Sequence, residues 1–280
     1  MNKNFDLNEQ FKADLSKLDT CHKIIFEFRD LLTDIKLEKW YSYFEMLLFQ
    51  YQMKSISLSN LLNGSKYQHI NFIDVPSLFI LLRGLIENYL MFYYLYKQPT
   101  SKDEIRFRLL IYQRSGLLNR QKYSAIPHDN PILKEESEEI EKLTVLINKH
   151  PMYYKLNSKI KNRIKTKATL FNFFEIIKSS KLSSKNFSTF WQLCSNFAHS
   201  EYISGMQMRS VYIDKLQSND LFNYKYQVLK HSLYLIVQII NDFKEMFEKL
   251  QNFYETNPYH IKKITKEYNI SNYDLYFRFF

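Results

Sequence analysis

The sequence predicts an all-α protein, a helical bundle with long core helices. Its 280 residues include only four glycines and six prolines, too few for the repeated tight turns of β-sandwiches, β-barrels and glycine-rich nucleotide folds. Apolar residues recur at three- and four-residue spacing over long stretches, as they do on one face of a helix. Aromatic residues make up 17% of the chain and hydrophobic residues 45%, which indicates an aromatic core and excludes wholesale disorder.

Two long helices are expected first. A stripe at helical spacing predicts a helix over 11–35, and its members are Leu15, Leu18, Ile25, Phe28 and Leu31. A second helix is expected over 37–62, and Gly64 is placed to end it.

Two capping signals place the next helices. Asp74 has the position of an N-cap for an apolar helix that runs to about Lys97. Ser101 and Glu104 form the pattern of a capping box, which predicts that another helix begins there and runs to roughly Lys122.

The rest of the chain is expected to be helical as well, without an internal repeat or a low-complexity linker. The elements are, in order, a turn at 127–131, an acidic helix, a basic stretch over 149–167, shorter helices at 168–179 and 186–203, a long helix over 219–256 and an aromatic tail. A chain without linkers is most simply one helical domain, residues 1–280.

Charge and cysteine usage bear on partners and compartment. The formal net charge is +10, which either points to an anionic partner such as nucleic acid or reflects the composition of an AT-rich genome. Cys21 and Cys194 are too few for a disulfide framework and fit a reducing compartment. The N-terminus lacks a secretory signal pattern, and Arg83 and Glu87 interrupt the most apolar stretch. We therefore expect a cytoplasmic protein with no membrane span.

Several kinds of site have no support in the sequence. The glycines stand apart, so there is no phosphate-binding loop, and no two histidines have the spacing of a metal-binding helix. The G-x-S-x-G motif of many hydrolases is absent as well. We therefore expect no metal and no cofactor.

Two charged residues stand in the most apolar helix of the chain. Arg83 and Glu87 are four residues apart, so they share one face of that helix. Because an isolated charge in apolar surroundings is costly, the two are expected to pair. The pair either lines a site or is a structural ion pair that fixes the register of the helix.

A second segment carries polar side chains between aromatic ones. Ser195, His199 and Tyr202 are expected on one face of the helix over 186–203, with Asn196 beside them. A lone histidine on a helix is more often a core residue than a catalyst. Here a hydroxyl, an amide and an imidazole on one stripe favour a site.

Together, the two segments resemble the HEPN-like helical domains of bacterial defence and toxin proteins. The shared features are an R-x-x-x-E helix, a later helix with the pattern [ST]-N-x-x-H and a final long helix, over about 75–256. The helices of 5–63 precede this core, and the aromatic tail, 259–280, follows it. HEPN ribonucleases usually carry an arginine shortly before the histidine, whereas Gln192 to Cys194 hold none. Either Arg83 supplies the cation from another helix, or the chain is an inactive relative.

The resemblance implies metal-independent cleavage of RNA to 2′,3′-cyclic phosphate and 5′-hydroxyl ends. His199 would be the general base or acid, and Arg83 would stabilise charge on the phosphorus oxygens. Glu87 would orient Arg83 or the imidazole, while Ser195 and Asn196 would hold the phosphate by hydrogen bonds. The resemblance also implies a homodimer with two sites facing one cleft, and a partner protein from a defence or toxin–antitoxin operon.

The basic stretch supplies candidate RNA-binding residues. Cations neutralise phosphates, and the preceding Tyr153 and Tyr154 are suited to stack on unpaired bases. The candidates are Lys155, Lys159, Lys161, Arg163, Lys165 and Lys167. The alternative is a solvated loop whose charges are partnered by the acidic helix before it.

Three functions follow from these patterns. The first is a toxin-like or antiphage ribonuclease, which requires His199 within hydrogen-bond reach of Arg83 or Glu87 in an open cleft. The second is a non-catalytic helical module that holds a partner protein through its aromatic surface and tail. The third is a nucleotide-sensing domain that binds a phosphate at Arg83 without cleaving it.

Overall fold

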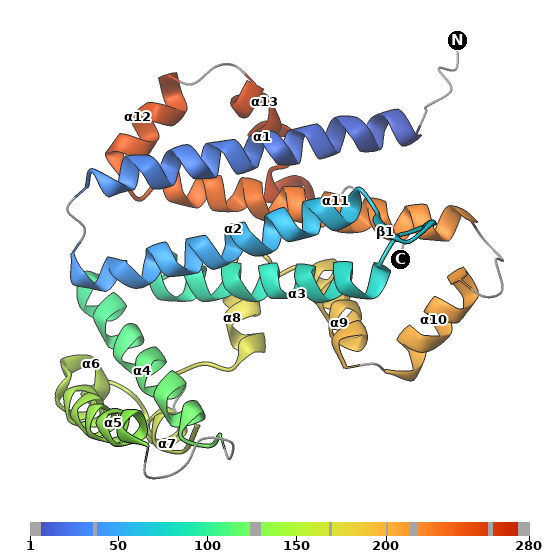
Figure 1. The fold of residues 1–280 in the computed structure, drawn as a ribbon. Coiled ribbons are helices and arrows are strands. Elements are labelled where there is room, and N and C mark those ends of the chain that lie inside the picture. Colours follow the sequence, from blue (N-terminus) through green and yellow to red (C-terminus); the bar gives the residue numbers. More distant parts are fainter. Residues whose placement is uncertain are drawn as a thin grey trace. The chain divides into compact units, whose positions relative to one another are not determined.

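The prediction of an all-α bundle with long core helices is confirmed. A computed structural model describes residues 7–35, 38–123, 130–167, 170–199, 201–212, 218–256 and 260–273. These residues form helices α1 to α13 and one short β-hairpin (Figure 1). They group into two compact units, of which the first comprises 1–91 and 181–280 and the second 92–180. That the two units make one folding domain stays a prediction.

The first unit contains most of the long helices. Its elements are α1 (Leu7–Thr33), a 3₁₀ turn (Lys39–Tyr41), α2 (Ser42–Leu62), β1 (Ser65–Tyr67), β2 (Ile70–Phe72), α3 (Val75–Phe92), α9 (Lys185–Ala198), α10 (Tyr202–Tyr212), α11 (Ser218–Lys244), α12 (Glu248–Thr256), α13 (His260–Glu267) and a second 3₁₀ turn (Ile270–Asn272). Helices α1, α2 and α11 pack against one another, as Figure 1 shows.

The core of the first unit is centred on α11. Leu229, Leu233, Ile236, Val237 and Ile240 lie at helical spacing along it and are completely buried. Complete burial of such a side chain is worth about 1.5–3 kcal/mol. This stripe therefore holds α11 against its neighbours, as the periodicity of the sequence predicts.

Helix α3 is also a core helix on one side. Leu78, Phe79, Leu82, Leu85 and Ile86 are completely buried. In the described part of the chain, the segment 75–97 alone is long and apolar enough to span a membrane, with a mean hydropathy of 1.3 over a window that is 56% buried inside the protein.

The predicted caps are present where a local signal marked them. Asp74 Oδ1 accepts a hydrogen bond from the backbone N–H of Ser77 at 3.1 Å. Ser101 Oγ accepts one from the N–H of Glu104 at 3.2 Å. Gly64 follows α2 with φ of +96°, a conformation that favours glycine.

Two predicted helices are each divided in the structure. The helix predicted over 186–203 ends at Ala198, and α10 begins at Tyr202. The helix predicted over 219–256 ends at Lys244, and α12 begins at Glu248. Neither break has a glycine or proline in it. At the second break, the ring of Phe247 packs on Phe44 with centroids 5.6 Å apart.

Two further elements were not predicted. Strands β1 and β2 pair antiparallel with Ser65 opposite Phe72, and the prediction did not include this hairpin. Helix α13 lies within the predicted aromatic tail, where Tyr268 and Tyr273 are buried. The remainder of that tail, 274–280, and the residues 257–259 lie outside the described residues.

The second unit contains the shorter helices. Its elements are a π-helical turn (Tyr93–Lys97), α4 (Lys102–Arg120), α5 (Pro131–Lys149), α6 (Pro151–Tyr154), α7 (Ser158–Lys167) and α8 (Phe173–Ser179). The buried guanidinium of Arg108 donates to Glu104, to Gln98 and to the carbonyl of Tyr94, at 2.5, 2.7 and 2.5 Å. Because every contact of this cation is charge-assisted, it ties the π-helical turn to α4.

Candidate functional site

The first unit brings the two polar segments of the sequence together. Arg83 on α3 and His199 at the end of α9 are 116 residues apart, and Nη1 of Arg83 lies 3.1 Å from Nε2 of His199. Arg83 Nε donates to Glu87 Oε1 at 2.8 Å on the same helix. His199, Arg83 and Glu87 thus form one hydrogen-bonded chain at the protein surface.

The direction of the first contact fixes the state of the imidazole. A guanidinium has only donors, so Nε2 of His199 must be the acceptor. With Nε2 as the acceptor, the ring proton is on Nδ1. Neutral imidazole is the form that can accept a proton, which general-base catalysis requires.

Packing between α3 and α9 sets the distance between the two side chains. Phe79, one turn before Arg83, stacks on Phe197 with ring centroids 4.5 Å apart and planes at 6°. Phe197 lies two residues before His199, so this buried stack fixes the register of the two helices next to the site. The ring of Trp191 lies 5.7 Å from the Arg83 guanidinium carbon, a cation–π contact that further restrains Arg83.

The end of α9 presents the imidazole to solvent. The N–H of His199 donates to the carbonyl of Ser195 at 3.0 Å, and that of Glu201 donates to the carbonyl of Asn196 at 3.0 Å. The single hydroxyl proton of Ser204 is shared between the same Asn196 carbonyl, at 3.2 Å, and the carbonyl of Glu201, at 2.7 Å. These contacts terminate the helix, so the His199 side chain is exposed beyond its last turn.

The break after Ala198 shows that one expected neighbour of His199 does not share its helix face, while two others remain on α9. Tyr202 begins α10 and is 76% exposed, so it does not share a helix face with Ser195 and His199. Ser195 and Asn196 are half-buried on α9, and the hydroxyl of Ser195 donates to the carbonyl of Trp191 at 3.1 Å. Their role toward a substrate stays a prediction.

Lys54 on α2 is a second cation beside this site that sequence patterns did not indicate. Its ammonium contacts the side-chain oxygen of Asn88 and lies 3.5 Å from the carbonyl of Gly84. Burial lowers the pKa of Lys54, and the charge of Glu87 acts in the opposite direction. Glu87 is therefore influenced by two cations from two helices. No motif in α2 signals this contact, because it depends on how α2 packs on α3.

A comparison with known protein families matches the part of the chain that contains this site. The sequence matches the family described as a family of unknown function, DUF5677, over residues 74–214. The chain belongs to this family. The DUF5677 region contains Arg83, Glu87, Ser195, Asn196 and His199, so all five candidate catalytic residues lie inside it. No curated protein and no solved structure matches the chain.

The predicted RNA-binding residues of the DUF5677 region differ in their surroundings. Arg163 donates to both carboxylate oxygens of Glu175, at 2.6 and 3.3 Å, and so is held in an ion pair. Lys161 donates to the carbonyl of Tyr154 at 3.3 Å and lies 5.4 Å from the centroid of the Tyr153 ring. The exposed members are Lys155, Lys159 and Lys165, and the side chain of Lys167 lies outside the described residues.

The alternative interpretation of the basic stretch, a solvated loop, is wrong about its secondary structure. Residues 158–167 are the helix α7, not a loop. The partner of Arg163 is on α8, while Glu136 of the acidic helix α5 pairs with Arg120 on α4. Among the ion pairs of the described residues, none joins α7 to α5.

No cluster in the described part of the DUF5677 chain has the composition of a metal site, since three or more His, Cys, Asp or Glu side chains do not gather anywhere in it. The two cysteines are buried, and burial raises the pKa of the Cys21 thiol to about 12. Burial also raises the pKa of Cys194, against the opposing charge of Arg83. Both thiols are therefore poor nucleophiles.

Proposed function

We propose that the protein is a metal-independent endoribonuclease of the HEPN-like kind, acting in the cytoplasm as part of a toxin or antiphage defence system. The observation that supports this most is the exposed contact between Arg83 and His199. The resemblance to HEPN-like domains implies a role in cleavage for these two residues, and two helices distant in sequence supply them. A cation beside a neutral imidazole is the minimum that such a reaction needs.

The reaction uses the 2′-hydroxyl of the RNA as nucleophile. Nε2 of His199 takes the 2′-hydroxyl proton, and O2′ attacks the adjacent phosphorus. Arg83 donates to the non-bridging oxygens as negative charge builds up on them. The bond from phosphorus to O5′ breaks, and O5′ takes up a proton from the imidazolium or from water. The products carry a 2′,3′-cyclic phosphate and a 5′-hydroxyl.

Because Arg83 contacts His199 in the free protein, substrate binding also affects the imidazole. Arg83 occupies the lone pair of Nε2, the atom that has to accept the proton. A phosphate diester that binds the guanidinium competes for the same N–H donor and releases Nε2. Glu87 keeps Arg83 in place through its Nε during this exchange. Binding of the anion therefore frees the base next to the hydroxyl it deprotonates.

The proposal extends to partners by the same resemblance. RNA is the expected substrate, Ser195 and Asn196 are proposed to hydrogen-bond its phosphate, and the chain is proposed to act as a homodimer. A partner protein encoded in the same operon would control the activity.

Cleavage of total RNA tests the proposal. Purified protein is incubated with total cellular RNA, with and without a chelator, and His199→Ala is compared with His69→Ala, an exposed histidine in the β-hairpin. We expect cleavage by the wild type and by His69→Ala in both conditions, and none by His199→Ala. Full activity of folded His199→Ala would contradict the proposed mechanism.

A second candidate function is a non-catalytic module that binds a partner protein. It is favoured by α10, where Tyr202, Ile203 and Met206 are 76%, 56% and 45% exposed. Apolar side chains clustered on one exposed helix are typical of a protein interface. Under this alternative the protein does not cleave RNA, and Ile203→Asp weakens capture of the operon partner.

A further inference from the structure

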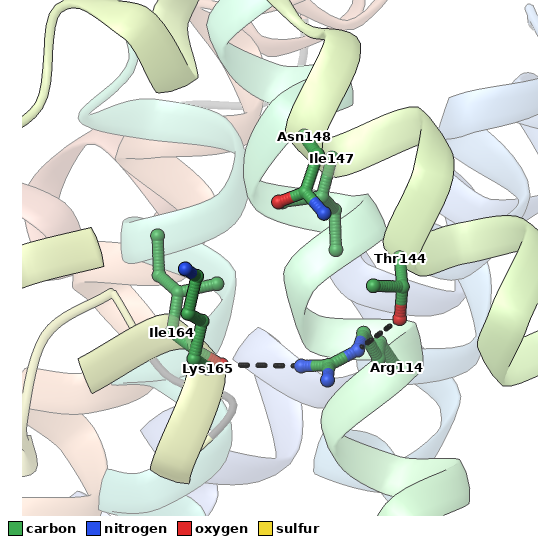
Figure 2. A pocket seen from close by; sticks show the side chains of 6 residues that line it. All are labelled: Arg114, Thr144, Ile147, Asn148, Ile164 and Lys165. Carbon is green, nitrogen blue, oxygen red and sulfur yellow. Dashed lines mark hydrogen bonds between the residues drawn. The ribbon is translucent and has the colours of Figure 1, made fainter. Parts of the chain in front are cut away.

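The second unit contains a small cavity remote in sequence from Arg83 and His199. It has a volume of about 230 Å³. Its lining residues come from α4, α5 and α7, and Figure 2 shows their side chains directed around one space: Arg114, Thr144, Ile147, Asn148, Ile164 and Lys165. Ile147 and Ile164 are buried and supply the apolar part, while the other four bring polar atoms.

Arg114 is held rigidly in this cavity by two neighbouring helices. Its Nε donates to the hydroxyl of Thr144 at 2.7 Å, and its Nη1 donates to the carbonyl of Ile164 at 3.1 Å (Figure 2). Thr144 in turn donates to the carbonyl of Ile140 at 2.7 Å, so its hydroxyl proton is used and its oxygen faces Arg114. The guanidinium is therefore oriented before any ligand arrives, which lowers the entropic cost of binding.

The donors that remain have no protein partner in the described residues. Within the described residues, Nη2 of Arg114, which is half-buried, makes no hydrogen bond, and the exposed side chains of Asn148 and Lys165, at the open side of the cavity, make no hydrogen bond or ion pair. No acidic side chain lines the cavity. Burial lowers the pKa of Arg114, and no carboxylate offsets this effect. An anion in the cavity would supply the missing negative charge.

We propose that the cavity of Arg114, Asn148 and Lys165 binds the phosphate group of a small ligand, either inorganic phosphate or a phosphomonoester such as a mononucleotide. The unpaired Nη2 of Arg114 can donate to phosphate oxygens, and the Lys165 ammonium and the Asn148 amide are suited to donate to the others. The volume accommodates a phosphate and a few further atoms, which is less than a typical pocket for a larger organic ligand. The proposal concerns binding alone and does not depend on RNA cleavage.

Calorimetric titration at constant ionic strength tests this proposal. The titrants are inorganic phosphate, adenosine 5′-monophosphate and a short single-stranded RNA without terminal phosphates, each with sodium chloride as the reference. The variants are Arg114→Gln and Lys165→Gln. The matched control is Lys134→Gln, which removes the same charge from an exposed position on α5, a helix that also lines the cavity, at a residue that is neither in the lining nor among the predicted RNA-binding residues.

We expect phosphate or the mononucleotide to bind the wild type and the Lys134→Gln protein equally. Binding should weaken at least about tenfold in Arg114→Gln and in Lys165→Gln, because each loses a charge-assisted hydrogen bond. If circular dichroism shows that Arg114→Gln is not folded, Lys165→Gln and Asn148→Leu decide the test.

Three results would overturn the proposal. They are the absence of binding by either small ligand, equal affinity in the wild type and the folded cavity variants, and equal weakening by Lys134→Gln. Tight binding of the RNA alone, weakened by the cavity variants, would reassign the cavity to an RNA backbone and so also overturn it.

Discussion

Replacing both members of the Arg83–Glu87 ion pair distinguishes a structural role of the pair from a catalytic one. The side chains of Arg83 and Glu87 are 22% and 40% exposed, so water screens the pair. Such a pair is worth about 0.5–1 kcal/mol, well below the roughly 3–5 kcal/mol lost when one member of a buried pair is removed. The double variant Arg83→Met/Glu87→Leu should therefore lower the thermal midpoint by only about 2–4 °C.

The rate should respond far more strongly than the stability. Removing one preorganised donor from a developing oxyanion typically lowers kcat about 100- to 1000-fold. The assay is single-turnover cleavage of a labelled RNA beside a thermal melt of the same preparation. The matched control is Glu255→Leu/Lys262→Met, which removes an ion pair of 2.8 Å whose members are 52% and 41% exposed. Cleavage by folded Arg83→Met/Glu87→Leu at the rate of the control would refute the catalytic role of both residues.

Three other predictions concern stability and RNA binding. Burial lowers the pKa of His231 to about 3. Between that pH and about 6.5, this histidine is therefore protonated in the unfolded chain but not in the folded one, so the free energy of unfolding falls by about 1.4 kcal/mol for each unit by which the pH is lowered. In urea unfolding, His231→Phe should reduce the loss between pH 7 and pH 5 by about 2 kcal/mol, and an unchanged loss would contradict this. Asp14 is completely buried, and one of its oxygens lies 2.8 Å from Lys230 Nζ. Asp14→Asn should therefore lower the free energy of unfolding by about 3 kcal/mol in the same assay. A loss below about 1 kcal/mol would show that the pair is dispensable. If exposed lysines bind RNA, Lys155→Gln/Lys159→Gln should reduce the salt slope of binding by about 1–2, whereas an equal slope would remove these two lysines from the interface.

Helix boundaries were predictable where one residue determines them. Asp74 and Ser101 cap helices as predicted because a side-chain oxygen satisfies a backbone N–H within three residues. The end of α9 at Ala198 was not predictable, since it depends on Glu201 and Ser204 both donating to the carbonyl of Asn196. Those contacts leave no signature in residue type, because the acceptor is a backbone carbonyl.

The sequence also predicted only part of the candidate site. Arg83 and Glu87 follow from helical spacing, and pairing of Arg83 with His199 was expected only through the family resemblance. Lys54 was missed because its position next to Glu87 results from the packing of two helices. Arg163 was assigned to RNA, but its partner Glu175 lies on another helix, so spacing along the chain gave no sign of the ion pair.

The chemical ends of the cleaved RNA test the central proposal most directly. Products made by the wild type in the presence of chelator are treated with polynucleotide kinase, with and without its phosphatase activity, to identify both ends. An attack by the 2′-hydroxyl, with His199 as base and Arg83 on the phosphate, predicts 2′,3′-cyclic phosphate and 5′-hydroxyl ends that are absent with His199→Ala. Products with 3′-hydroxyl and 5′-phosphate ends, or cleavage that the chelator abolishes, would contradict it.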